Sequence, residues 1–85
     1  MVQRDTSVEI IAPLTGIYYG AASPSSPPFV SVGDVVQVGQ VVALVEAMKV
    51  FNEIQAEVAG RVIAIVAIHG EVVQKGDALI RLHPV

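Results

Sequence analysis

The sequence predicts one small all-β domain, a barrel or a sandwich built from two related halves. Its composition is the first reason: 17 of the 85 residues are Val and 8 are Ile, while aromatic residues make up 5% and Trp is absent. An aliphatic core rich in β-branched residues is typical of strands. The second reason is regular spacing, because short apolar runs alternate with glycine-containing pairs and no stretch has a helical period. Those pairs are Gly33-Asp34, Gly39-Gln40, His69-Gly70 and Gly76-Asp77.

An internal repeat is the third reason. Residues 33–45 match residues 70–82 at an offset of 37, and residues 9–16 match residues 53–60 at an offset of 44. Each half alone has too few strands to bury a face, so the repeat predicts a pseudo-twofold β unit. The two offsets differ by 7, which places about seven extra residues between Gly16 and Gly33.

Composition also excludes several functions. The net charge of −3 leaves no basic stripe for nucleic acid, and the absence of Cys excludes thiolate chemistry and suits a reducing compartment. The longest apolar run, Val62–Ile68, is far shorter than the roughly 20 residues of a membrane span, and residues 1–7 resemble no secretory signal. We therefore expect no membrane partner. No His or Ser stands in a catalytic or metal-binding motif, so we expect neither kind of site.

The extra residues of the first half lie in residues 20–29, the only stretch rich in Pro and Ser. Three Pro within five residues cannot donate hydrogen bonds to a ladder, so this stretch is expected to be a loop or a protrusion. It is either a tolerated surface insertion or a stiff, proline-braced finger. Which of the two interpretations holds depends on which residues lie beside this stretch in the folded chain.

Residues 41–56 contain no Gly, Pro or Asp, yet 16 extended residues would span roughly 53 Å, more than the diameter of about 30 Å expected for this chain. The strand must therefore fold back. A two-residue turn at Met48-Lys49 keeps one face apolar apart from Asn52, whereas a three-residue loop would spoil that face. A four-residue loop over residues 48–51 also keeps the pattern and stays open. The predicted inner face comprises Val41, Ala43, Val45, Ala47, Val50, Asn52, Ile54 and Ala56, and the mixed outer face comprises Val42, Leu44, Glu46, Phe51, Glu53 and Gln55.

Met48 and Lys49 break the local rule for such a turn. Tight hairpins prefer Asn-Gly or Asp-Gly, and a non-glycine residue held at positive φ costs about 1–3 kcal/mol. A local conflict of this kind is typical of functional sites, and an apolar Met48 at an exposed tip indicates a partner. Lys49 could instead be a solubilising residue, as we interpret Lys75. Since an exposed lysine amine is protonated at neutral pH, we interpret Lys49 as an attachment point that another enzyme activates.

Glu46-Ala47-Met48-Lys49, followed by residues 50–54, resembles the attachment motif of the biotinyl domain family. The resemblance covers residues 8–82. It implies a flattened pseudo-twofold β-barrel sandwich, or hammerhead, with biotin on Lys49 at a hairpin tip opposite the chain termini. It also implies a recognition surface around Lys49 that comprises Glu46, Ala47, Met48 and Val50. Met48 separates this motif from that of lipoyl domains, where an acidic residue usually precedes the lysine, while Val50 replaces the commoner Met or Leu.

The Pro-rich stretch resembles the thumb found in biotin carboxyl carriers of acetyl-CoA carboxylases and generally lacking in other biotinyl domains. Ala22-Ser23-Pro24 partly matches the Ser-Pro element of that thumb, and Ala21 or Ala22 replaces the Thr that contacts biotin. The expected organisation is a flexible tail over residues 1–7 and a biotinyl domain over residues 8–85. That domain includes the thumb at residues 20–29 and the biotin hairpin at residues 41–56.

The resemblance implies a carrier without catalytic residues of its own. A biotin protein ligase would attach biotin to Lys49, a biotin carboxylase would carboxylate it with ATP and bicarbonate, and a carboxyltransferase would pass the carboxyl group to acetyl-CoA for fatty acid biosynthesis. The expected location is the cytoplasm, or the plastid stroma for a plant protein. Carriers of this family usually include an N-terminal assembly segment, so the chain is expected to be an excised domain or a short carrier.

Three alternatives stay open at this point. A lipoyl carrier of the same fold would bear lipoate on Lys49. A biotinyl domain of another carboxylase or decarboxylase would serve a different acceptor. A barrel-sandwich interaction domain would leave Lys49 unmodified.

Overall fold

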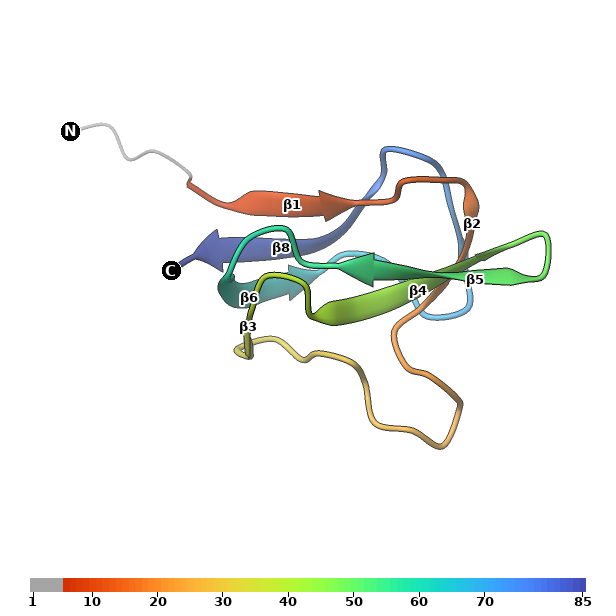
Figure 1. The fold of residues 1–85 in the computed structure, drawn as a ribbon, viewed down its shortest axis with the longest axis horizontal. Coiled ribbons are helices and arrows are strands. Elements are labelled where there is room, and N and C mark those ends of the chain that lie inside the picture. The colour runs from red at the N-terminus through yellow and green to blue at the C-terminus, as the bar shows by residue number, and fades with distance from the viewer. Residues whose placement is uncertain (1–5) are drawn as a thin grey trace.

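Two four-stranded antiparallel sheets make up the computed structural model, which describes residues 6–85 (Figure 1). One sheet has the strand order β1-β8-β6-β3 and the other has the order β5-β4-β2-β7. The strands are β1 (Val8–Ile11), β2 (Gly16–Tyr19), β3 (Val35–Val36), β4 (Val41–Ala47), β5 (Val50–Gln55), β6 (Gly60–Ile65), β7 (Val72–Val73) and β8 (Ala78–Pro84). The predicted all-β class is therefore confirmed. Residues 6–85 contain no helix, and hence none that could cross a bilayer.

The two sheets repeat one another, as the internal repeat predicts. Strands β3 and β4 correspond to β7 and β8 at an offset of 37, and β2 corresponds to β6 at an offset of 44. Hydrogen bonds repeat as well: the Gly33 amide donates to the Val62 carbonyl at 2.8 Å, and the Gly70 amide donates to the Tyr18 carbonyl at 2.7 Å. Both glycines have positive φ, of 99° and 85° respectively. The turn chemistry of the two halves is thus the same.

The core lies between the two sheets and is aliphatic except for one tyrosine ring. Its largest fully buried side chains come from both halves of the repeat, which confirms the expectation that Val, Ile and Leu supply the packing. These side chains are Val36, Val42, Val45, Val62, Leu79, Ile80 and Leu82.

A β-bulge corrects one part of the predicted hairpin faces. Beyond Ala43, which pairs with Ile54, the register shifts so that Val41 pairs with Gln55. The shift adds one residue to β4 and turns the fully buried Val42 into the core. The prediction that Val42 lies on the mixed outer face is therefore wrong, because strict alternation assumes a ladder without a bulge.

The β4–β5 hairpin projects from one end of the molecule, and the C-terminus lies at the opposite end (Figure 1). Residues 20–29, which connect β2 towards β3, form a separate protrusion on the flank of the sheets. Of the predicted flexible tail, residues 1–5 lie outside the described residues. The Thr6 hydroxyl lies 3.4 Å from Nδ1 of His83.

Candidate functional site

The turn that joins β4 to β5 has two residues, Met48 and Lys49. Ala47 pairs with Val50 across it, which confirms the two-residue turn and excludes the four-residue loop. Met48 has φ 52° and Lys49 has φ 65°, and they are the two non-glycine residues with positive φ within residues 6–85. Positive φ at both central residues is the mark of a type I′ turn, whose twist matches that of the flanking strands. The hairpin therefore keeps a tight turn with two residues that disfavour it.

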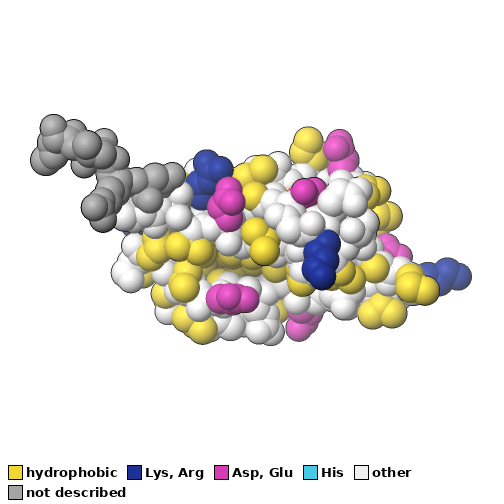
Figure 2. All heavy atoms as spheres, turned by 90° about the horizontal axis from the view of Figure 1, so that it is seen from above, with side chains coloured by type: hydrophobic (Ala, Val, Ile, Leu, Met, Phe, Trp, Pro, Cys, Tyr) yellow, Lys and Arg dark blue, Asp and Glu magenta, His cyan; other side chains and the backbone are white. Residues whose placement is uncertain are grey.

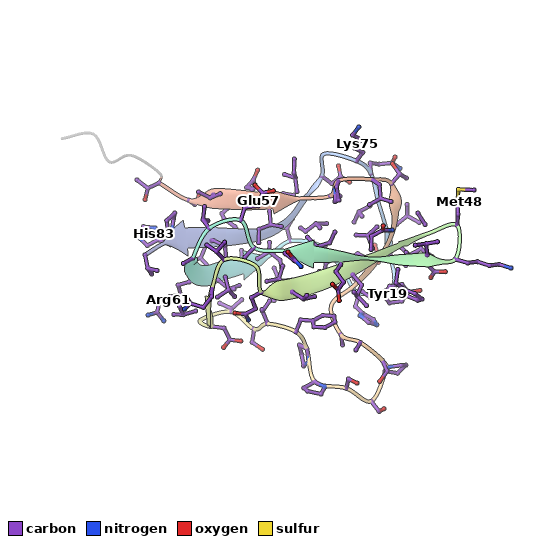
Figure 3. The ribbon with its side chains drawn as sticks, viewed as in Figure 1. Tyr19, Met48, Glu57, Arg61, Lys75 and His83 are labelled. Atoms are coloured by element: carbon purple, nitrogen blue, oxygen red, sulfur yellow. The ribbon has the colours of Figure 1, made fainter. Side chains whose placement is uncertain are left out.

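The side chains of the turn are exposed. Met48 is 96% exposed and Val50 is 59% exposed, and Lys49 is likewise exposed. In Figure 3, Met48 stands at the extreme of the hairpin and points away from both sheets. In Figure 2, a basic side chain projects beyond the same end of the molecule, with apolar side chains next to it. The amine of Lys49 is thus open to a partner that covers the tip.

Glu46 lies on β4 opposite Phe51 of β5 and Ile17 of β2. Its carboxylate oxygen Oε1 accepts a hydrogen bond of 3.0 Å from the hydroxyl of Tyr19. That hydrogen bond raises the pKa of Tyr19, and partial burial and the negative charge of Glu46 raise it further. The Glu46 carboxylate is therefore held by a side chain from the neighbouring strand.

A row of three rings runs from the hairpin to the base of the protrusion. The Tyr19 ring lies 5.6 Å from the Phe51 ring at 51° and 5.5 Å from the His69 ring, edge-on at 78°. Nδ1 of His69 in turn accepts a hydrogen bond of 3.0 Å from the Gly20 amide. Tilted and edge-on ring pairs at these distances are favourable. The row therefore connects β5, β2 and the first residue of the protrusion.

Sequence analysis missed Tyr19 and Phe51 and interpreted His69 only as a turn residue. His69 does lie in a turn, but its ring contacts Tyr19, which is 50 residues away in the chain. The only signal in the sequence for an outward-facing ring was the Tyr18-Tyr19 pair. Successive side chains of a strand point to opposite faces, so one of the two rings enters the core and the other faces outward. Tyr18 is indeed buried, and burial raises its pKa.

The protrusion closes on itself as a short hairpin-like finger. Ala21 bridges Pro28, and the Phe29 amide donates to the Gly20 carbonyl at 2.8 Å. At its tip the hydroxyls of Ser23 and Ser26 lie 2.7 Å apart. These contacts favour the interpretation of residues 20–29 as a braced finger over a slack insertion.

A hollow of about 320 Å³ lies between this finger and the end of β6, with Ala21, Ser23, Pro24, Ile65 and His69 among its lining residues. Ala22 is exposed. Within the part of the chain that the structure describes, no hydrogen bond, ion pair or ring contact joins residues 21–24 to Met48 or Lys49. Instead, the finger reaches the hairpin through Gly20, His69 and Tyr19.

The hairpin holds the amine of Lys49 where another protein can reach it. Lys49 stands at the end of a β-ribbon, and the nearest carboxylate along β4, that of Glu46, is engaged by Tyr19. An exposed amine on a rigid turn fits covalent acylation by another protein, because the tip enters a partner's site before the sheets collide with it. The site therefore fits a covalently held prosthetic group better than one bound in a cavity.

Residues 8–82 match a protein family described as biotin-requiring enzyme. Among curated proteins, the chain is 51% identical over 83 residues to the biotin carboxyl carrier protein of acetyl-CoA carboxylase from Chlamydia muridarum, a match that covers 94% of this chain and 51% of that protein. Its counterpart from Nostoc is 43% identical over 76 residues, which covers 89% of this chain and 42% of that protein. The chain thus spans about half the length of the curated relatives it matches.

Two solved structures share the fold. The urea carboxylase of Kluyveromyces lactis matches 98% of this chain with a TM-score of 0.76 and 25% identity, over 7% of that protein. A single-chain, multi-domain long-chain acyl-CoA carboxylase matches all of it with a TM-score of 0.80 and 22% identity, over 8% of that protein. In both, the matching part is a small fraction of a much larger chain.

Proposed function

This chain belongs to the family of biotin-requiring enzymes, and we propose that it is the carrier domain of an acetyl-CoA carboxylase, with biotin attached to Lys49. The observation that carries the proposal is the exposed Met48-Lys49 turn, in which two non-glycine residues hold positive φ at the end of the hairpin. Curated relatives named as carriers of acetyl-CoA carboxylase support the choice of enzyme. The finger at residues 20–29, which resembles the thumb of such carriers, supports it further.

Lys49 acts as the acceptor in the attachment step. Its uncharged amine attacks the carboxyl carbon of biotinyl-AMP, a C–N bond forms, the C–O bond to AMP breaks, and the amine releases one proton to solvent. In the proposal, Glu46, Ala47, Met48 and Val50 form the surface that the ligase recognises. Biotin, once bound, supplies a ureido nitrogen that accepts and releases a carboxyl group.

The domain contributes position instead of bond chemistry. A rigid β-ribbon holds the modified side chain clear of both sheets, so that it can enter one partner's site and then another's. A tethered reactant reaches an effective concentration in the mM range for short flexible links. The proposed partners are a biotin protein ligase, a biotin carboxylase and a carboxyltransferase. The proposed location is the cytoplasm, or the plastid stroma for a plant protein.

Intact-mass measurement tests the proposal. The purified chain, incubated with biotin, ATP and a biotin protein ligase, should gain the mass of one biotinyl group. Lys49→Arg should gain none, because it keeps the charge but removes the acceptor amine, while the matched Lys75→Arg should be modified as the wild type is. A parallel incubation with lipoate and a lipoate ligase should leave the mass unchanged. Addition at Lys75, addition of lipoate alone, or no addition would each overturn the assignment.

A further inference from the structure

Tyr19 occupies a central position beside the hairpin that the proposed function does not explain. Its side chain leaves β2 on the outer face, between Glu46 on β4 and His69 in the β6–β7 connection. Figure 3 shows Tyr19 below the root of the projecting hairpin. The hydroxyl of Tyr19 thus hydrogen-bonds to β4, and its ring packs against side chains of β5 and of the β6–β7 connection.

The hydroxyl of Tyr19 engages one oxygen of the Glu46 carboxylate. A carboxylate offers about four acceptor positions on its two oxygens, so a single donor at Oε1 leaves Oε2 free for a second donor. Without that bond, the partly exposed Glu46 side chain would sample several rotamers, each with the carboxylate elsewhere. Because Glu46 lies three residues before Lys49 on the same ribbon, its orientation decides what an approaching protein meets beside the amine.

The ring of Tyr19 is itself fixed in place. Phe51 and His69 pack against it at 5.6 and 5.5 Å, and the Gly20 amide holds His69 through Nδ1. Contacts from three elements restrict the χ angles of Tyr19, so the direction of its hydroxyl is set before any partner binds. Preorganisation of this kind lowers the entropy that association must otherwise remove.

We propose, on the basis of the proposed function, that Tyr19 is a positioning residue for lysine modification: it presets the Glu46 carboxylate so that Oε2 meets a hydrogen-bond donor of the modifying ligase. The donor is a basic side chain or an N–H group, since an ionised carboxylate only accepts. Tyr19 touches neither Lys49 nor the reacting carbon and acts through Glu46.

Ligase kinetics with the unmodified chain as the varied substrate test this role. Tyr19→Phe keeps the ring and removes the hydroxyl, so a smaller fraction of the chain presents Glu46 in the competent orientation. The apparent affinity falls by that fraction, and we expect KM for the chain to rise roughly three- to tenfold with kcat unchanged. The matched control, Tyr18→Phe, removes the hydroxyl of the adjacent buried ring and should leave both constants at the wild-type values.

A double-mutant cycle separates positioning from a structural effect. In a Glu46→Ala background, which already has a raised KM, Tyr19→Phe should add nothing, because the hydroxyl has no carboxylate left to hold. Titration of the Tyr19 phenol by NMR gives a second readout: Glu46→Ala should lower its pKa towards the ordinary value, since the carboxylate raises it in the wild type. The pKa of the neighbouring Tyr18, which burial raises, should stay raised in Glu46→Ala, whereas loss of hairpin structure would lower it as well.

The outcomes distinguish two failures. A wild-type chain that accepts no biotin overturns the proposed function together with the role of Tyr19. A wild-type chain that is biotinylated, with Tyr19→Phe unchanged in KM, changed only in kcat, or additive with Glu46→Ala, overturns the role of Tyr19 alone.

Discussion

At the scale of single residues, Met48 and Lys49 hold a backbone conformation that costs stability. Positive φ in an L-residue brings Cβ close to the following carbonyl oxygen. Glycine has no Cβ, and asparagine offsets the cost because its short polar side chain hydrogen-bonds to the nearby backbone. Four glycines serve this purpose elsewhere in the chain, at residues 33, 39, 70 and 76. The tip keeps an exposed thioether and an amine instead, as expected where the side chains are needed for function.

Met48→Asn should therefore stabilise the domain and impair its modification. Asparagine tolerates positive φ, so we expect the free energy of unfolding to rise by about 0.5–1 kcal/mol, measured by urea denaturation. Biotin transfer by the ligase should slow, since the apolar contact beside Lys49 is gone. Lys75→Asn is the matched control, in a turn position without positive φ, and should change stability by no more than about 0.5 kcal/mol. A less stable Met48→Asn variant would contradict the assignment of strain to the turn.

At the scale of elements, two glycines let neighbouring strands of the same sheet lie close together, β6 beside β8 and β2 beside β4. A Cβ atom on Gly60 would lie 2.8 Å from the carbonyl oxygen of His83, and one on Gly16 would meet the carbonyl oxygen of Glu46 even more closely. These two positions correspond at an offset of 44, and the carbonyl groups they face correspond at an offset of 37. Glycine is thus required at the same place in each half, because a strand backbone passes there.

Gly60→Ala should destabilise the domain, because the obstructing atom belongs to the backbone of β8 and cannot rotate away. The expected loss is about 1–3 kcal/mol, measured by thermal or urea unfolding. Gly20→Ala serves as the control: the nearest atom to its added Cβ would be the Tyr18 hydroxyl at 3.4 Å, an ordinary contact, so its stability should stay near that of the wild type. Equal effects at both positions would contradict this account.

At the scale of the whole molecule, the turn of the β4–β5 hairpin and the C-terminus lie at opposite ends (Figure 1). The pseudo-twofold relation explains why: the turn at residues 48–49 occupies, in its own half, the place that the end of β8 and the start of β1 occupy in the other. The Val85 amide donates to the Ala59 carbonyl at 3.3 Å, at the end away from the turn. With this layout, a domain can be attached to another protein at its C-terminal end while the hairpin at the opposite end binds its partners.

A globular protein fused after Val85 through a flexible linker should therefore leave kcat/KM for biotin transfer within about twofold of the wild-type value, because the linker keeps the fused protein away from the tip. The same protein inserted between Met48 and Lys49 should abolish transfer. The measurement is ligase kinetics on each fusion, with folding checked by circular dichroism. A large loss of transfer in the C-terminal fusion would show that the two ends are not independent.

Much of this architecture could be read from local rules. The repeat offsets predicted the paired strands and the equivalent turns, and the limit on the length of an extended strand, together with the side-chain parity, predicted the turn at Met48-Lys49. The β-bulge after Val41 could not be predicted, because a bulge changes which face a residue occupies without any signal in composition. The predicted direction of the Val42 side chain was wrong for that reason.

By itself, the sequence determined the all-β class, the two related halves, the position of the hairpin turn and the lysine that it carries. All of these follow from interactions between near neighbours or from a periodicity that repeats along the chain. Only the tertiary structure decided which side chains gather beside the hairpin that carries that lysine. Tyr19, Phe51 and His69 come together because β4 pairs with both β2 and β5 and the β6–β7 connection is hydrogen-bonded to β2. Contacts between segments so far apart in the chain depend on which strands pair, and local rules do not fix that pairing.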